Sequence, residues 1–139
     1  MSIRFQVSFD AHDPPALARF WALALGYIEQ PPPEGFETWE AFADQMGIPQ
    51  ERGADVGAVV DPDGDGPRLL FQRVPEGKTA KNRVHLDVNV SAPDHDWQKV
   101  TAHVDRLVQA GATKVEERQD EVSHWVVMLD PEGNEFCLQ

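Results

Sequence analysis

Two pairs of chemically active side chains stand two residues apart in segments whose apolar residues alternate. His85 and Asp87 lie within the alternating residues 84–90, and Glu135 and Cys137 lie near the end of the chain. Residues i and i+2 of a strand point to the same face of a sheet, so each pair is expected to share a face. Imidazole, carboxylate and thiol groups transfer protons, orient polar ligands or hold metal ions. We therefore take His85 and Glu135 as candidate catalytic residues, and Asp87 and Cys137 as candidate ligand-binding residues.

Other nucleophile arrangements are poorly supported. Ser8 and Ser123 lack the glycine-flanked turn between a strand and a helix that exposes a nucleophilic serine. Cys137 and His85 would form a thiol–imidazole pair across a cleft, but their order and strand positions match no catalytic signature. Plainer readings stay open: Cys137 as a small buried hydrophobe, and His85 as a cleft histidine bonded to Asp87, Gln6 or a ligand.

The elements that would position these groups occur twice along the chain. Each half begins with a strand pattern, at residues 5–10 and at residues 84–91. A helix pattern follows, opened by Asp13-Pro14-Pro15 in the first half and by Pro93-Asp94 in the second. Glycine is expected to end both helices, and a second strand follows each one.

Each half then closes on a turn of the same composition. Residues 61–64 read Asp-Pro-Asp-Gly and residues 130–133 read Asp-Pro-Glu-Gly, each between two apolar segments. Proline fixes the turn and glycine supplies a positive φ, so each turn should join antiparallel strands. The order strand, helix, strand, strand, strand therefore repeats, and such a repeat decides the architecture.

The first half carries an insertion. Gly26 to Asp61 spans 35 positions and Gly111 to Asp130 spans 19, a difference of 35 − 19 = 16 residues. The extra residues fall within 30–47, which contain three consecutive prolines and several aromatic side chains. Long aromatic connections often act as lids over binding sites, so Phe36 and Trp39 are candidate ligand-binding residues; alternatively the aromatics cover the first helix.

Four segments together resemble a known group of proteins. They are Ala16–Trp21 with Leu25-Gly26-Tyr27, Arg68–Lys78, Lys81–Asp87 and Asp130–Leu138. They resemble the vicinal oxygen chelate superfamily, which contains glyoxalases, bleomycin resistance proteins and dioxygenases. The resemblance implies an α+β fold in a single domain, residues 1–139, in which two tandem βαβββ modules, about 1–76 and 82–139, form a curved mixed sheet around a cleft.

The resemblance also implies where metal ligands would stand. Metal-using relatives present His or Gln, Glu, His and Glu from four strands, and those positions correspond here to Gln6, Leu70, His85 and Cys137. Both glutamates are missing, so no metal cofactor is favoured. A divalent metal in an altered site stays open, with Gln6, His85, Glu135 and Cys137 as its candidate ligands.

Two functional hypotheses follow. The first is a glyoxalase-like small-molecule-binding protein without the usual four-ligand metal site; the second is a metal-dependent lyase, isomerase or dioxygenase with an altered site. An accessory domain that contributes only an interface is a third. The expected cleft would suit a planar or aromatic molecule, and its lining residues are Gln6, Ser8, His85, Asp87, Trp125, Glu135 and Cys137, with Phe36 or Trp39 as a roof.

Composition narrows the range of partners. The formal net charge is −12, which argues against nucleic acid and against anionic membranes. A single cysteine and the lack of an apolar run long enough to span a membrane indicate a cytoplasmic protein. The resemblance suggests a homodimer. The basic residues Lys78, Lys81 and Arg83 would either hold an anionic group of a substrate or form a solvated linker.

Overall fold

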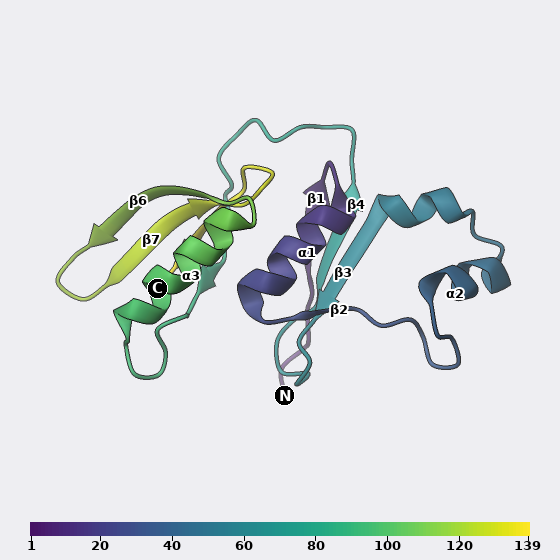
Figure 1. The fold of residues 1–139 in the computed structure, drawn as a ribbon, viewed down its shortest axis with the longest axis horizontal. Coiled ribbons are helices and arrows are strands. Elements are labelled where there is room, and N and C mark those ends of the chain that lie inside the picture. The colour runs from purple at the N-terminus through teal and green to yellow at the C-terminus, as the bar shows by residue number, and fades with distance from the viewer. The chain divides into compact units, whose positions relative to one another are not determined.

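The computed structural model describes residues 1–139 as an α+β chain with two four-stranded mixed sheets (Figure 1). The strand order is β1-β4-β3-β2 in the first sheet and β5-β8-β7-β6 in the second. Each sheet has one parallel pair, β1 with β4 and β5 with β8, and its other pairs are antiparallel. The expected α+β fold of tandem βαβββ modules is therefore confirmed.

The chain forms two compact units, residues 1–22 with 26–77, and residues 23–25 with 78–139. The strands of the first sheet are β1 (Val7–Ala11), β2 (Ile28–Glu29), β3 (Val56–Val60) and β4 (Leu69–Arg73). The helices that precede the second module are α1 (Pro14–Leu25), α2 (Trp39–Met46) and the 3₁₀ helix η1 (Gln50–Asp55). The second module contains β5 (Asp87–Val88), α3 (Trp97–Gln109), β6 (Thr113–Gln119), β7 (His124–Leu129) and β8 (Glu135–Leu138).

Strand register shows the internal repeat directly. In the parallel pairs, Ser8 lies opposite Leu70 and Asp87 lies opposite Cys137. Leu70 and Cys137 therefore hold equivalent positions in the two modules. Gln6 and His85 stand two residues before Ser8 and Asp87, so they are equivalent as well.

Local signals set the start of the first helix. The Asp13 carboxylate accepts a hydrogen bond from the Ala16 N–H at 3.2 Å, and prolines fill the first two helical positions. Asp13 therefore caps one of the free N–H groups at the helix start, and the prolines lack N–H groups that would need partners. Gly26 ends the helix with φ 70°, a value that favours glycine. This part of the prediction is confirmed.

Three element boundaries differ from the sequence prediction. The first strand begins at Val7 rather than Phe5, because pairing with β4 begins there and Phe5 stays 70% exposed. Helix α3 begins at Trp97, because the Asp96 carboxylate caps it by accepting from the Gln98 N–H at 3.0 Å. The segment expected to be a strand over residues 84–91 has only two residues of regular strand, β5.

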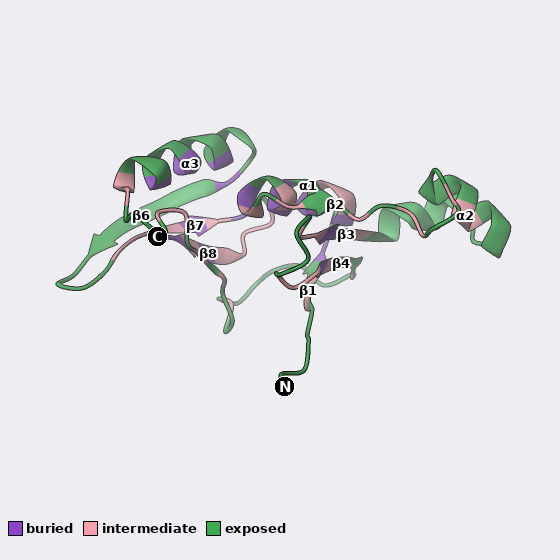
Figure 2. Cartoon of the chain, turned by 90° about the horizontal axis from the view of Figure 1, so that it is seen from below, coloured by how far each residue is buried: buried purple, intermediate pink, exposed green.

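Each sheet buries one face under a helix. In the first unit the core side chains are Leu17, Phe20, Trp21, Val59, Leu69 and Phe71. In the second, Val100, Val104 and Leu107 of α3 are buried together with Val126, Met128, Phe136 and Leu138 of β7 and β8. Figure 2 shows this burial on the side of α3 that faces the strands. The alternation leaves the odd-numbered residues of β7 and β8 on the face opposite α3.

The two Asp-Pro turns have the predicted function. The Asp61 carboxylate accepts hydrogen bonds from the N–H groups of Asp63, Asp65 and Gly66, at 2.9, 3.1 and 2.7 Å. Asp130 accepts from the N–H groups of Glu132 and Asn134 in the same way. These hydrogen bonds, first among them the one from Asp63, hold the pKa of Asp61 below its usual value. Each aspartate therefore stabilises a tight connection between two core strands.

The insertion between β2 and β3 forms an exposed lobe beyond the β2 edge of the first sheet (Figure 1). Helix α2 buries none of its residues. The Phe42 ring packs edge-on against Phe36 and Trp39, at centroid distances of 5.3 and 5.8 Å, and the Trp39 indole N–H donates to the Gln30 carbonyl at 2.8 Å. These aromatics thus pack on one another. None of the helices has the length and hydropathy that a membrane-spanning helix requires.

Candidate functional site

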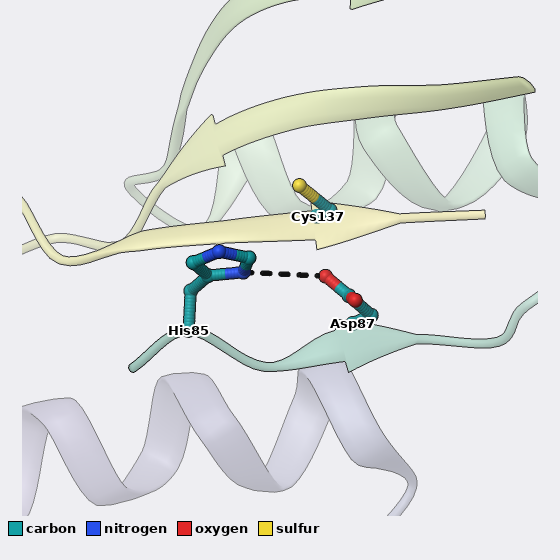
Figure 3. Close-up of side chains that lie close together, drawn as sticks. All are labelled: His85, Asp87 and Cys137. Atoms are coloured by element: carbon teal, nitrogen blue, oxygen red, sulfur yellow. Dashed lines mark ion pairs between the residues drawn. The ribbon is translucent and has the colours of Figure 1, made fainter. Parts of the chain in front are cut away.

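A group of potential ligand atoms lies on the face of the second sheet opposite α3. His85 and Asp87 reach this face from β5 and the residues just before it, and Cys137 reaches it from β8 (Figure 3). The His85 Nδ1 atom lies 3.4 Å from Asp87 Oδ1. The ligand atoms of all three residues lie within 4.8 Å of one another. The structure thus brings together three of the residues selected from the sequence.

Cys137 holds its thiol proton. Burial raises the pKa of the Cys137 thiol, and the charge of Asp87 and a hydrogen bond to it raise that pKa further. Lys81 and Arg118 act in the opposite sense but do not outweigh these effects. At neutral pH the thiol therefore donates to the Asp87 carboxylate, which also lies beside the His85 imidazole.

Arg118 lies on the same face, although it was not among the site residues predicted from the sequence. It lies on β6 directly opposite Trp125, and its guanidinium forms an ion pair with Glu116 at 2.6 Å. The hydrogen bond to Glu116 raises the pKa of Arg118, so its charge is permanent. Two signals in the sequence could have revealed it. Glu116 and Arg118 are two residues apart in one strand, so they share a face, and the hairpin that follows places Arg118 opposite Trp125.

Glu135 shares this face but has other partners. It lies opposite Leu129, and its carboxylate accepts from the Asn82 N–H at 2.9 Å and pairs with Lys78 at 3.2 Å. The Asn82 hydrogen bond is the main reason why the pKa of Glu135 is lowered, with Lys78 adding to it. The carboxylate is therefore ionised and holds the segment that leads into β5. Lys78 thus pairs with an acidic side chain, as expected if the basic residues between the modules form a linker rather than a substrate site.

The remaining candidate ligand-binding residues lie in the first unit. Gln6 lies just before β1, and its side-chain oxygen accepts from Arg68 at 2.9 Å. Arg68 also donates to Gln30 at 2.8 Å. Ser8 is exposed on β1, opposite Leu70. Phe36 and Trp39 lie in the insertion lobe described above.

The usual metal positions do not form a complete ligand set. Leu70 occupies the position equivalent to Cys137, and a leucine side chain has no atom that binds a metal. His85, Asp87 and Cys137 form a different set of potential ligands. In this set the carboxylate comes from Asp87, since both of the usual glutamates are missing. Nitrogen, oxygen and sulfur donors together suit a borderline divalent ion such as zinc.

Fold and sequence together define the class of protein. The sequence profile of the glyoxalase-like domain matches residues 6–139. The chain therefore belongs to the glyoxalase-like domain family, within the vicinal oxygen chelate superfamily expected from the sequence. No curated protein sequence matches it significantly.

Solved structures support the same fold at low sequence identity. A glyoxalase/bleomycin resistance protein/dioxygenase family enzyme from Burkholderia phytofirmans PsJN is 18% identical with a TM-score of 0.64, over 96% of this chain and 94% of that chain. The fosfomycin resistance protein FosX from Listeria monocytogenes, complexed with manganese(II) and a dihydroxypropylphosphonic acid, is 11% identical with a TM-score of 0.66, over 100% and 90%. The bleomycin-binding protein of Streptomyces verticillus, complexed with copper(II)-bleomycin, is 18% identical with a TM-score of 0.55, over 100% and 96%.

Proposed function

We propose that this chain binds a small molecule on the face of the second sheet that carries His85, Asp87 and Cys137, and that it does so without the usual four-ligand metal site. The observation that carries the proposal is the convergence of these three side chains within 4.8 Å on one sheet face. A few convergent polar groups beside apolar surface are the usual composition of a ligand site. The leucine at position 70 removes one of the family's usual metal ligands.

The residues on this face have distinct roles in the proposal. His85 and Asp87 orient the ligand by hydrogen bonds, and Trp125 supplies apolar contact. Arg118 and Lys81 supply positive charge close to Cys137, which favours an anionic or electron-rich group at that end of the ligand. If the protein is an enzyme, His85 and Glu135 are the proton-transfer groups we propose.

The candidate ligand-binding residues Gln6, Ser8, Phe36 and Trp39 belong to the first unit, and their part in binding is a separate proposal. Gln6 and Ser8 would supply polar contacts, and Phe36 or Trp39 would grip an aromatic ligand. A matched pair of variants tests that part. Trp39→Ala should weaken binding of an aromatic ligand, whereas Met46→Ala, on the same exposed helix, should not.

His85→Ala is the central test. We expect it to weaken binding of any aromatic carboxylate or catechol found by ligand-observed NMR, while the melting temperature changes little because the side chain of His85 is 43% exposed. His95→Asn, at an exposed histidine with φ 56°, is the matched control. A large loss of stability with unchanged binding would show that His85 is structural.

A metal-dependent lyase, isomerase or dioxygenase is the second candidate, favoured by the same three ligand atoms. His85, Asp87 and Cys137 would hold the ion, which would then polarise two neighbouring oxygens of a substrate. Elemental analysis should be made after dialysis against zinc, nickel, manganese or ferrous iron. Near-stoichiometric metal that is lost in His85→Ala would favour this candidate, whereas absence of metal under all four conditions would favour the metal-free proposal.

Assembly and cellular location are proposals as well. We expect a homodimer, because twofold dimers are the commonest oligomers, and a cytoplasmic location, because the chain has one cysteine. Sedimentation equilibrium and cell fractionation test these two expectations. A monomer at micromolar concentration, or recovery from the membrane fraction, would contradict them.

A further inference from the structure

A recess lies on the α3 face of the second sheet, on the other side from His85. Its volume is about 520 Å³. Pockets that hold small molecules in proteins commonly measure about 300–1,000 Å³. Its lining residues come from α3, β6 and β7 and include Trp97, Asp105, Val108, Lys114, Glu117 and Val126. We call this recess the α3–β6 groove.

The packing of α3 explains why the groove exists. Val100, Val104 and Leu107 are buried together with residues of β7 and β8, whereas every residue of β6 is exposed. The edge strand β6 therefore extends past the surface that the helix covers. Val126, which is 2% exposed, forms part of an apolar floor between the helix and this strand.

Charged and aromatic groups form the walls. Trp97 stacks on His124 with ring centroids 3.2 Å apart and planes 12° apart, and His124 Nε2 lies 2.9 Å from Glu117 Oε1. This contact uses one oxygen of Glu117 and leaves the other able to accept a hydrogen bond. Asp105 adds a second carboxylate and Lys114 the one ammonium group, so the walls carry a net negative charge in a chain of net charge −12.

We propose that the α3–β6 groove binds a small organic cation with an apolar body, such as an arylalkylamine. The carboxylates of Asp105 and Glu117 would pair with the ammonium group, and the valines with Trp97 would contact the apolar part. The field of the whole chain adds to this attraction, because a strongly acidic protein concentrates cations at its surface.

The alternative occupant, a strand that pairs with the β6 edge, is disfavoured by the sequence of β6. The strand carries Lys114, Glu116, Glu117 and Arg118, and its register shifts between residues 114 and 116. Charged side chains and bulges are the features that prevent edge strands from pairing with other chains. A small molecule in the groove would not need to pair with the backbone of β6.

Titration of the ¹⁵N-labelled protein with 2-phenylethylamine tests the proposal. The amine should shift the Trp97 indole resonance and the amide resonances of Glu117 and Val126, with a dissociation constant on the order of 1 mM, as expected for a fragment. Neutral 2-phenylethanol has the same ring and should bind about fivefold more weakly, because an exposed ion pair contributes up to ~1 kcal/mol, and anionic phenylacetate should bind more weakly still. Equal binding of phenylacetate, or no shift of groove resonances, would overturn the proposal.

Two variants separate the groove from general attraction to an acidic protein. Asp105→Asn combined with Glu117→Gln should weaken amine binding about fivefold or more, whereas Glu121→Gln, outside the groove, should not change it. Unchanged binding in the double variant would refute the proposal. If the double variant does not fold, Val108→Lys places a competing cation at a 44% exposed wall position and should have the same effect. His85→Ala should leave amine binding intact, so this test stands apart from the proposed function.

Discussion

The Cys137 thiol shows how a neighbour on an adjacent strand sets the chemistry of a side chain. Cys137 is half-buried and donates a hydrogen bond to Asp87, and both effects raise its pKa. A thiol must lose its proton to attack an electrophile or to bind a metal. The environment therefore keeps Cys137 unreactive unless a cation replaces the proton.

Asp87→Asn should make Cys137 more reactive. The change removes a negative charge, which lowers the thiol pKa and raises the thiolate fraction at pH 8. Alkylation by iodoacetamide, followed by mass spectrometry, should become several times faster. Asp105→Asn, on helix α3, which covers the other face of the sheet, is the control and should leave the rate unchanged. A rate for Asp87→Asn no higher than that of the unaltered protein would show that Asp87 does not control the thiol.

Glu135 makes a pH-dependent contribution to stability. Its pKa is lowered in the folded protein, so this contribution is present above the unfolded value, about 4.3, and is lost as the pH falls through the folded pKa. Glu135→Gln should reduce the free energy of unfolding by about 1 kcal/mol at pH 7 and by almost nothing at pH 3. Urea unfolding at the two pH values measures this difference.

The matched control for Glu135 is Glu121→Gln, at an exposed residue in the connection between β6 and β7. A loss for Glu135→Gln that is the same at both pH values would contradict the ionic origin of its effect.

At the scale of elements, β3 and α1 approach each other closely at Gly57. A Cβ atom at this position would lie 2.7 Å from the Pro14 carbonyl oxygen and 2.9 Å from the Ala18 Cβ. Both distances are shorter than van der Waals contact, and one involves backbone that cannot move without disturbing the helix. Glycine at this position therefore allows the helix to lie against the sheet.

Gly57→Ala should destabilise the protein by about 1–3 kcal/mol, the usual cost of overpacking. Chemical denaturation measures the change. Gly53→Ala, in η1, is the control, because a Cβ there would have no atom within 4 Å. If the two variants were equally stable, the close approach of β3 to α1 would not be a constraint on the fold.

At the scale of the whole molecule, net charge is the dominant feature. With a formal charge of −12, repulsion among carboxylates opposes compaction, and salt screens that repulsion. The melting temperature should rise by a few degrees when sodium chloride is increased from about 10 mM to about 150 mM. A fall in the melting temperature would mean that ion pairs such as Lys99–Asp94 stabilise the fold by more than the repulsion among carboxylates destabilises it.

Much of the fold could be predicted because it depends on local signals. The Asp13 cap, Gly26 and the two Asp-Pro turns act within a few residues, so their spacing showed the repeated order of elements. The boundary of α3 was wrong because two aspartates, Asp94 and Asp96, precede it, and only the backbone geometry decides which one caps the helix.

The site could be predicted only in part. Alternation in the sequence placed His85 with Asp87 and Glu135 with Cys137, each pair on one strand face. The sequence could not show that Asp87 lies opposite Cys137, or that Glu135 pairs with Lys78 and Asn82, because register between distant strands is set by packing of the whole sheet. The α3–β6 groove was missed for the same reason.

The sequence by itself determined the repeated modules, the acidic character of the protein and the types of reactive side chain, since composition, caps and alternation are local properties. Tertiary structure decided which of those side chains meet. It joined Cys137 to Asp87 and His85 and gave Glu135 a separate partner, because contacts between strands far apart in the chain depend on how each sheet buries its apolar face under a helix.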